Sequence, residues 1–233
     1  MNYVITPPAI PAVNVAASDA HFPVNRVYCV GRNYAAHAIE MGHDPNREEP
    51  FFFMKAPDNL LPASESDGGG TFPYPPKTQD VHHEIELVIA LAKGGTDIPL
   101  ETAMDCIWGF GVGIDMTRRD LQGEAKKAGR PWDTGKAFDY AAPMSCLHPI
   151  AQTGNMERGR VWLEVNGKVR QEGDLNQLIW KIPEIISYLS GLFTLRPCDL
   201  IFTGTPPGVG PVSVGDILVG GIDGLSDIKV TVG

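Results

Sequence analysis

The sequence predicts an α+β fold that is rich in short strands. Glycine and proline supply 26 and 20 of the 233 residues, and both are spread along the chain, which indicates many turns rather than one disordered linker. Short apolar runs of strand length recur throughout, whereas helical signals are confined to a few short segments. This pattern favours a β-rich α+β domain over a doubly wound α/β fold.

The individual elements follow from local signals along the chain. Residues 1–22 are expected to form an extended, proline-containing lead-in, and Asn33 and Thr117 are expected helix N-caps. Asn166-Gly167 between two strand-like segments is the signal of a tight hairpin. The expected strands cover residues 26–30, 51–54, 82–91, 108–115, 161–165, 168–170, 200–202, 216–222 and 227–232. The expected helices cover residues 33–41, 99–107, 117–128, 174–180 and 183–192.

Charge and composition exclude several classes of protein. The formal net charge of −9 argues against a nucleic-acid partner. No apolar run approaches the roughly 20 residues that a membrane helix needs, and residues 1–15 lack the basic and apolar regions of a signal peptide. The four cysteines are widely spaced without a CxxC pair, so we expect a cytoplasmic protein with reduced thiols.

An acidic strand at residues 81–89 is the most informative feature of the chain. Its alternation is that of a half-buried strand, with the apolar side chains of Ile85 and Leu87 on one face and Glu84 and Glu86 on the other. Two like charges on one strand face repel each other, so a positive group is expected between them. Carboxylate oxygens are the preferred ligands of hard divalent cations, which makes a metal ion the natural candidate.

A second strand, at residues 108–115, adds a third carboxylate. Gly109, Gly111 and Gly113 share one of its faces with Asp115, and a row of glycines indicates close approach by a ligand or by another backbone. Glu84, Glu86 and Asp115 together would suit Mg²⁺ or Mn²⁺ and would leave coordination positions open for water or substrate.

Candidate substrate contacts follow this strand. Arg119 and Gln122 are three residues apart on an expected helix and therefore share a face, and the guanidinium of arginine is well shaped to bind a carboxylate. Lys136 lies in a weakly charged segment, which is unusual for a surface lysine.

His37 and Glu40 are also three residues apart, and a carboxylate beside an imidazole suits a general base that acts on water.

Other catalytic motifs are absent from the sequence. The glycines of residues 109–113 have the wrong spacing for a dinucleotide fingerprint, and the loop at residues 204–210 lacks the lysine and hydroxyl residue of a phosphate-binding loop. No G-x-S-x-G motif is present, which argues against a serine hydrolase of that type.

Taken together, these segments resemble the fumarylacetoacetate hydrolase family. The matching segments, in the order of the family, are YCVGRNYAAHAIE at 28–40, HHEIELVIA at 82–90, GIDMTRRDLQ at 113–122, GRPWDTGKAFD at 129–139, VNGKVRQEG at 165–173 and FTGTPPGVGPV at 202–212. One departure is Lys55-Ala56-Pro57, where many members have lysine directly before proline.

The resemblance implies a rolled mixed β-sheet with short peripheral helices, formed by a single catalytic domain at residues 23–233. It implies that Mg²⁺ or Mn²⁺, with Ca²⁺ able to take their place, binds to the three carboxylates. It implies that His37 and Glu40 are the dyad that activates water, on a helix that orders over the substrate. Lys136, Arg119, Gln122 and Thr205 match positions that contact the substrate. A homodimer is the implied assembly.

The implied reaction is hydrolysis of a carbon–carbon bond in a 2,4-dioxo acid, with 3-fumarylpyruvate as the expected substrate and fumarate and pyruvate as products. The distal carboxylate of that substrate needs a cationic partner, for which Arg32, Arg118 and Arg130 are the candidates. Three alternatives use similar chemistry: a general acylpyruvase, an oxaloacetate decarboxylase, and a decarboxylase or isomerase of homoprotocatechuate breakdown. A non-catalytic binding protein would be expected to lack His37, Glu40 or Lys136, and all three are present.

Overall fold

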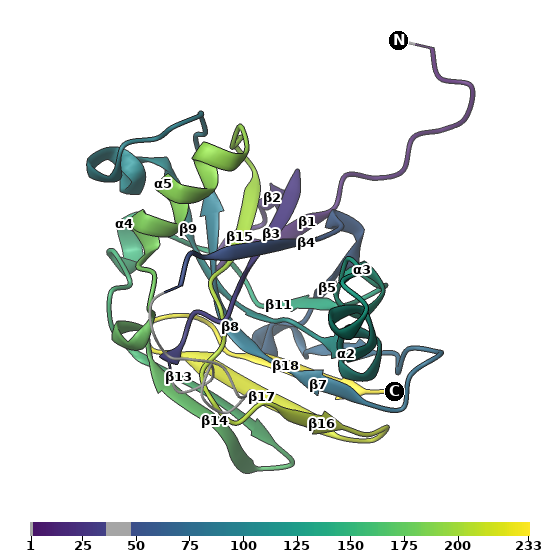
Figure 1. The fold of residues 1–233 in the computed structure, drawn as a ribbon. Coiled ribbons are helices and arrows are strands. Elements are labelled where there is room, and N and C mark those ends of the chain that lie inside the picture. The colour runs from purple at the N-terminus through teal and green to yellow at the C-terminus, as the bar shows by residue number, and fades with distance from the viewer. Residues whose placement is uncertain (1, 36–47) are drawn as a thin grey trace.

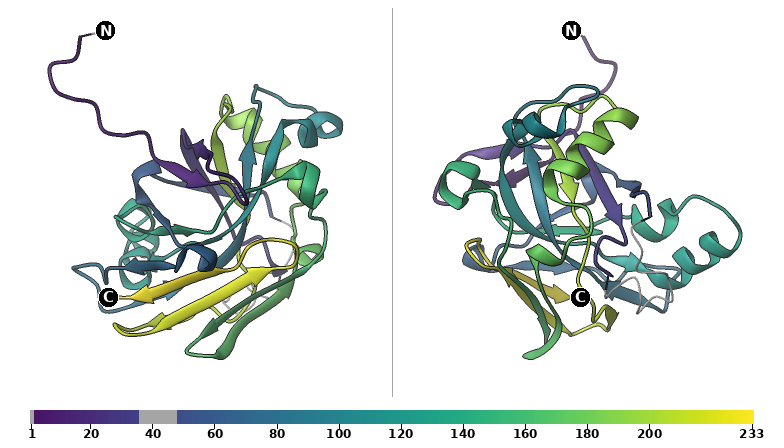
Figure 2. Two further views of the ribbon diagram at one scale, coloured as in Figure 1. Left: turned by 180° about the vertical axis from the view of Figure 1, so that it is seen from behind. Right: turned by 60° about the vertical axis from the view of Figure 1, so that its left-hand side comes forward.

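The computed structural model describes residues 2–35 and 48–233 of the chain. Two main β-sheets form separate layers, and short helices lie around them (Figures 1 and 2). The larger sheet has the strand order β4-β3-β15-β8-β9-β11-β5, with β12 paired to β9, and the smaller has the order β14-β13-β17-β18-β6. Both sheets mix parallel and antiparallel pairs, so the predicted β-rich α+β class is confirmed.

The strands are short and joined by turns, as the glycine and proline content predicts. Those of the larger sheet are β3 (Arg26–Gly31), β4 (Phe51–Lys55), β5 (Leu60–Pro62), β8 (Ile85–Leu91), β9 (Ile107–Ile114), β11 (Ala142–Met144), β12 (His148–Pro149) and β15 (Asp199–Phe202). Those of the smaller sheet are β6 (Gly70–Phe72), β13 (Arg160–Val165), β14 (Lys168–Asp174), β17 (Ile217–Ile222) and β18 (Ile228–Val232). A three-stranded sheet contains β7 (Val81–His83), β10 (Thr117–Arg118) and β16 (Gly210–Val212), and β1 (Ala12–Asn14) pairs with β2 (His21–Pro23).

The described helices are few and peripheral. The α-helices are α2 (Arg119–Lys127), α3 (Asp133–Lys136), α4 (Ile150–Thr153) and α5 (Ile182–Leu192). The 3-10 helices are η1 (Pro57–Asn59), η2 (Glu65–Asp67), η3 (Leu100–Cys106) and η4 (Leu175–Gln177). Helices α2 and α3 lie together on one side of the sheets in the views of Figures 1 and 2. None of the described helices is long and apolar enough to cross a membrane.

The larger sheet is buried on both of its faces near its centre. One hydrophobic cluster fills the space between the two main sheets and includes Leu87 and Ile89 of β8. A second cluster on the opposite face contains Val88 and Ala90 of the same strand. The expectation of a half-buried acidic strand is therefore wrong, because every residue of β8 is buried. The charged residues of this strand lie inside the protein and need partners there.

The N-terminal segment ends in this second cluster. Strands β1 and β2 place Val13 and Phe22 against it, whereas residues 2–10 extend away from the body of the protein (Figures 1 and 2). The boundary at residue 22 between a lead-in and the catalytic domain stays a prediction.

Two local predictions have different outcomes. The hairpin is confirmed, since Asn166 and Gly167 both have the positive φ angles of a type I′ turn between β13 and β14. The helix start at Thr117 is wrong, because Thr117 pairs with His82 across β10 and β7, and α2 begins at Arg119. Tertiary strand pairing thus overrides the local capping signal. Most of the helix expected at residues 33–41 lies outside the described residues.

The glycines of β9 are explained by close approach of other chain segments rather than of a ligand. An added Cβ at Gly109 would meet the backbone carbonyl of His148, and one at Gly113 would lie 2.5 Å from the ring of Phe202. These positions allow β12 and β15 to pack onto the central strands.

We expect Gly109→Ala to lower the free energy of unfolding by about 3 kcal/mol or more, because the contact is with backbone that cannot rotate away. Gly123→Ala is the matched control, since its added methyl group meets nothing within 4 Å and it lies inside α2, where alanine is favoured by up to about 1 kcal/mol. Urea unfolding of both variants measures the difference. Equal stability of the two variants would contradict this account.

Candidate active site

Three carboxylates converge at the centre of the larger sheet. Glu84 lies between β7 and β8, Glu86 lies in β8, and Asp115 directly follows β9, the antiparallel neighbour of β8. The Asp115 amide donates a hydrogen bond of 2.8 Å to the Glu84 carbonyl, which fixes the register at this point. One ligand oxygen from each side chain lies within 4.8 Å of the others, and all three residues are buried. The geometry therefore brings together the three predicted metal ligands.

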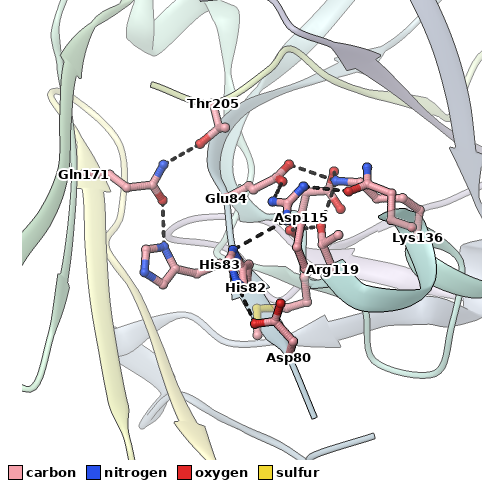
Figure 3. A network of polar contacts seen from close by, with 12 residues as sticks. Asp80, His82, His83, Glu84, Asp115, Arg119, Lys136, Gln171 and Thr205 are labelled. Atoms are coloured by element: carbon pink, nitrogen blue, oxygen red, sulfur yellow. Dashed lines mark hydrogen bonds and ion pairs between the residues drawn. The ribbon is translucent and has the colours of Figure 1, made fainter. Parts of the chain in front are cut away.

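Three cationic side chains contact two of these carboxylates, and Figure 3 labels two of the three, Arg119 and Lys136. Lys136 Nζ lies 2.8 Å from Glu84 Oε2 and 2.6 Å from Asp115 Oδ2, and Lys55 Nζ lies 2.8 Å from Asp115 Oδ1. Arg119 pairs with the other oxygen of Glu84. Burial lowers the pKa of Lys136, but Asp115 and Glu84 outweigh it and raise that pKa overall, so Lys136 is charged.

Glu86 differs from the other two carboxylates. Among the described residues it contacts no cation, and its Oε2 accepts a hydrogen bond of 2.7 Å from the Gly204 amide. Burial, together with the charges of Asp115 and Glu84, raises the pKa of Glu86 well above its usual value. A buried carboxylate with no cationic partner is the feature that a divalent cation would compensate, so the donor set fits Mg²⁺ or Mn²⁺.

A cavity of about 580 Å³ opens above this cluster. Glu84, Glu86 and Lys136 lie in its wall. The other described residues of the wall include aromatic and cationic side chains, namely Phe51, Phe53, Trp132, Arg32, Arg119, Lys126 and Lys127. A protein with a net charge of −9 has thus gathered positive side chains around one cavity, which favours an anionic ligand.

The structure places most of the predicted substrate contacts in this cavity. Gln122, Thr205, Arg119 and Arg32 all lie in its wall. His37 and Glu40 lie outside the described residues. Of the other candidates for the distal carboxylate, Arg118 stacks on Phe138 at 4.3 Å, and neither it nor Arg130 lines the cavity.

Sequence reasoning did not identify several residues that support the site. In the sequence, Lys55 is distinctive only for its position before Ala56-Pro57, yet it contacts Asp115 and donates to the backbone carbonyls of Met116 and Lys136. Its signal in the sequence is a lysine at the end of an apolar strand. Thr117 accepts a hydrogen bond of 2.7 Å from Lys136 Nζ, and Gln171 reaches Thr205 from β14.

Together, this fold and this site define a class of protein in which three buried carboxylates form a candidate metal site beside a cavity with cationic side chains in its wall. Residues 26–233 match the family model described as fumarylacetoacetate (FAA) hydrolase C-terminal. The chain belongs to the fumarylacetoacetate hydrolase family.

Comparison with known proteins identifies relatives with two kinds of activity. The crystal structure of fumarylpyruvate hydrolase from Pseudomonas aeruginosa in complex with Mn²⁺ and pyruvate is 52% identical, with a TM-score of 0.96 over 99% of both chains. A fumarylpyruvate hydrolase of Ralstonia sp. is 43% identical over 82% of this chain and 96% of its own length. The mitochondrial oxaloacetate tautomerase of Arabidopsis thaliana is 41% identical over 89% of this chain and 90% of its own length.

The raised pKa of Glu86 predicts how stability depends on pH. Without metal, the folded protein keeps the Glu86 proton at pH values where the unfolded chain has lost it, so the free energy of unfolding falls as pH rises above about 4.5. This slope is at most about 1.4 kcal/mol per pH unit. Mn²⁺ would bind the ionised form of this carboxylate, so adding it should oppose the fall in the free energy of unfolding.

We expect Glu86→Gln to remove this component of the slope, and urea unfolding at several pH values, with and without Mn²⁺, measures it. Comparing the variant with the unaltered chain removes the contribution of other titrating groups. Identical slopes in the two metal-free proteins would contradict the assignment.

Proposed function

We propose that this chain hydrolyses the C3–C4 bond of a 2,4-dioxo acid, most specifically 3-fumarylpyruvate, to give fumarate and pyruvate in gentisate-type aromatic catabolism. The observation that carries the proposal is the buried cluster of Glu84, Glu86 and Asp115 at the base of a cavity with cationic walls. The similarity to the Pseudomonas aeruginosa enzyme, which binds Mn²⁺ and pyruvate, supports it.

Mg²⁺ or Mn²⁺ held by the three carboxylates would act as a Lewis acid that stabilises negative charge on the oxygens of the departing pyruvate. The charges of Lys55, Lys136 and Arg119 equal in number those of the three ionised carboxylates, although these cations contact only Glu84 and Asp115. A divalent ion would therefore give the cluster an excess of two positive charges. This excess favours a substrate that carries two carboxylates.

Gln122 is the proposed hydrogen-bond donor to the oxyanion that forms at C4. Its Oε1 accepts a hydrogen bond of 2.6 Å from Arg119 Nη1, and an arginine can only donate, so the orientation of the amide is fixed. The amide nitrogen is then the end of Gln122 that is left to donate to a ligand in the cavity.

Lys136 supports the reaction through its charge and its contacts. Its three ammonium protons are directed at Glu84, Asp115 and Thr117, so in this arrangement none is left for the substrate. We assign it to holding two metal ligands in place and to stabilising the oxyanion by its positive charge.

His37, oriented by Glu40, is the proposed general base. It takes a proton from the water that attacks C4, and the C3–C4 bond then breaks to release pyruvate in its enolate form and fumarate. Protonation of the enolate at C3 completes the turnover. Arg119 and Thr205 are the proposed contacts of the substrate carboxylate at C1.

Arg32 is the proposed partner of the distal carboxylate. Its guanidinium lies over the ring of Phe51 at 5.1 Å, and its only ion pair with a described residue is a long contact of 3.9 Å with Glu48. Burial lowers the pKa of Lys126, and the like charges of Arg32 and Arg119 lower it further, as expected for cations that share one cavity wall. A second carboxylate of the substrate would relieve the repulsion among these like charges.

The tautomerase relative defines the main rival function. Oxaloacetate also carries two carboxylates and forms an enol, so a metal site of this kind would serve either substrate. The size of the cavity favours the longer molecule, because its wall extends from the carboxylates to Arg32 and Trp132.

An assay of metal-stripped protein tests the proposal. Fumarylpyruvate, acetylpyruvate and oxaloacetate are each supplied with and without Mg²⁺ or Mn²⁺, and loss of the enol absorbance is followed. We expect fast, metal-dependent loss with fumarate and pyruvate as products. Slow turnover of fumarylpyruvate beside rapid consumption of oxaloacetate or acetylpyruvate would contradict it and favour the rival functions.

We expect Arg32→Gln to lower kcat/KM for fumarylpyruvate about tenfold or more, because the distal carboxylate loses a charged hydrogen-bond partner. Acetylpyruvate has no distal carboxylate, so its kcat/KM should change less than about twofold. Arg130→Gln is the matched control, since Arg130 does not line the cavity. Equal losses for both substrates would place the role of Arg32 elsewhere.

The assembly and location are proposals of the same kind. We propose a homodimer, supported by the apolar sequence of β4 at the edge of the larger sheet, where Met54 is exposed. We also propose that residues 23–233 form a single domain and that the protein is cytoplasmic. The match of the family model to residues 26–233 supports the domain boundary.

A further inference from the structure

We propose that Gln171 is a positioning residue, which fixes the direction of the Thr205 hydroxyl so that its proton points into the cavity and donates to a carboxylate of the ligand. The identity of that ligand rests on the proposed function, whereas the direction of the hydroxyl follows from the hydrogen bonds alone.

Gln171 bridges parts of the chain that are distant in sequence (Figure 3). It lies on β14 in the smaller sheet, it is fully buried, and its amide reaches both the junction of β7 with β8 and the loop after β15. Figure 3 draws Gln171 in one network of polar contacts with the predicted metal ligands Glu84 and Asp115, and among the labelled residues Gln171 is the one that comes from the smaller sheet.

Two backbone groups fix the orientation of the Gln171 amide. Its Oε1 accepts a hydrogen bond of 3.1 Å from the Ile85 amide, and its Nε2 donates one of 2.9 Å to the Pro206 carbonyl. A flipped amide would place two donors together at Ile85 and two acceptors together at Pro206. His83 Nδ1, at 2.9 Å from Oε1, must then donate as well.

This orientation determines the role of the Thr205 hydroxyl. Gln171 Nε2 lies 2.7 Å from Thr205 Oγ1, and because Nε2 can only donate, the hydroxyl oxygen accepts. The single hydroxyl proton must therefore point elsewhere. Thr205 is only 3% exposed and lines the cavity, and its hydroxyl donates no hydrogen bond to another residue in the described part of the chain.

A buried donor without an acceptor is unfavourable, so we expect a ligand to supply the acceptor for this proton. The cavity walls are cationic, which makes a carboxylate oxygen the fitting acceptor. The direction of the hydroxyl is thus set in advance by Gln171, and no reorientation is needed when the ligand binds.

Other contacts hold the loop itself. The Gly204 amide donates to Glu86, and an added Cβ at Gly208 would meet the carbonyl of Arg170, so the loop backbone lies directly against β14. Removing the Gln171 amide should therefore release the hydroxyl while the loop stays in place.

A double-mutant cycle tests the proposal, with Gln171→Met, Thr205→Val and the combined variant. The readouts are the Kd of pyruvate for the Mn²⁺-loaded protein, measured by calorimetry, and KM and kcat for fumarylpyruvate. We expect Thr205→Val to weaken pyruvate binding about tenfold, as loss of a hydrogen bond to a charged group should. Gln171→Met should weaken it about two- to tenfold, and the combined variant should bind no more weakly than Thr205→Val.

If the losses of binding free energy, calculated from the Kd values, are additive, the proposal is overturned, because additivity would show that Gln171 does not act through Thr205. Unchanged binding in Gln171→Met, or no pyruvate binding by the unaltered protein, would overturn it equally. Thr205→Ser keeps the hydroxyl and should retain binding. If Gln171→Met does not fold, Gln171→Glu replaces it, because its second oxygen accepts from Thr205 and draws the proton away from the cavity.

Ser145→Ala is the control for stability. Ser145 is buried and accepts a hydrogen bond of 3.0 Å from the Val112 amide, but it does not line the cavity, so its loss should lower stability and leave Kd unchanged. The outcome is independent of the proposed reaction. If fumarylpyruvate is not hydrolysed while the cycle shows full coupling, the proposed function fails and the role of Gln171 stands.

Discussion

Mutual repulsion of three buried carboxylates is the constraint on which the rest of the site depends. Glu84, Glu86 and Asp115 have oxygens within 4.8 Å of one another in the interior, where burial of each unpaired ion costs several kcal/mol. Lys55 and Lys136 offset part of that cost and are themselves almost fully buried. Neither set of charges could be buried without the other, so the cations are structural partners of the carboxylates as well as sources of positive charge.

The fold supplies these partners from separate elements. Glu84 lies between β7 and β8, Glu86 lies in β8 and Asp115 follows β9, whereas Lys55 ends β4 and Lys136 ends α3. The central strands can carry these charged residues because, away from the site, hydrophobic clusters cover both faces of the same strands. Glycines in β9 allow neighbouring segments to approach closely enough to form that covering. Packing thus creates the low dielectric in which the charges of the site act strongly.

Local patterns in the sequence predicted the parts of the structure that depend on nearby residues. The hairpin at Asn166-Gly167 is confirmed, and alternation placed Glu84 and Glu86 on one face. Long-range pairing explains the rest. Thr117 has the signal of a helix cap but pairs with His82, and Gln171 shows no local sign that it contacts Thr205, 34 residues away. Such contacts depend on which distant segments pair in the fold, and a short segment of the sequence does not contain that information.

The loop after β15 connects the candidate metal site with the candidate substrate cavity. Gly204 donates its amide to Glu86, the carboxylate that lacks a cation, and the next residue, Thr205, presents its hydroxyl to the cavity. A displacement of this dipeptide would therefore disturb a candidate metal ligand and a candidate substrate contact together. Because Gln171 and the close contact at Gly208 hold the same loop against β14, the smaller sheet acts as the support that keeps both contacts in register. The smaller sheet thus supports the candidate site, even though none of the three predicted metal ligands lies in its strands.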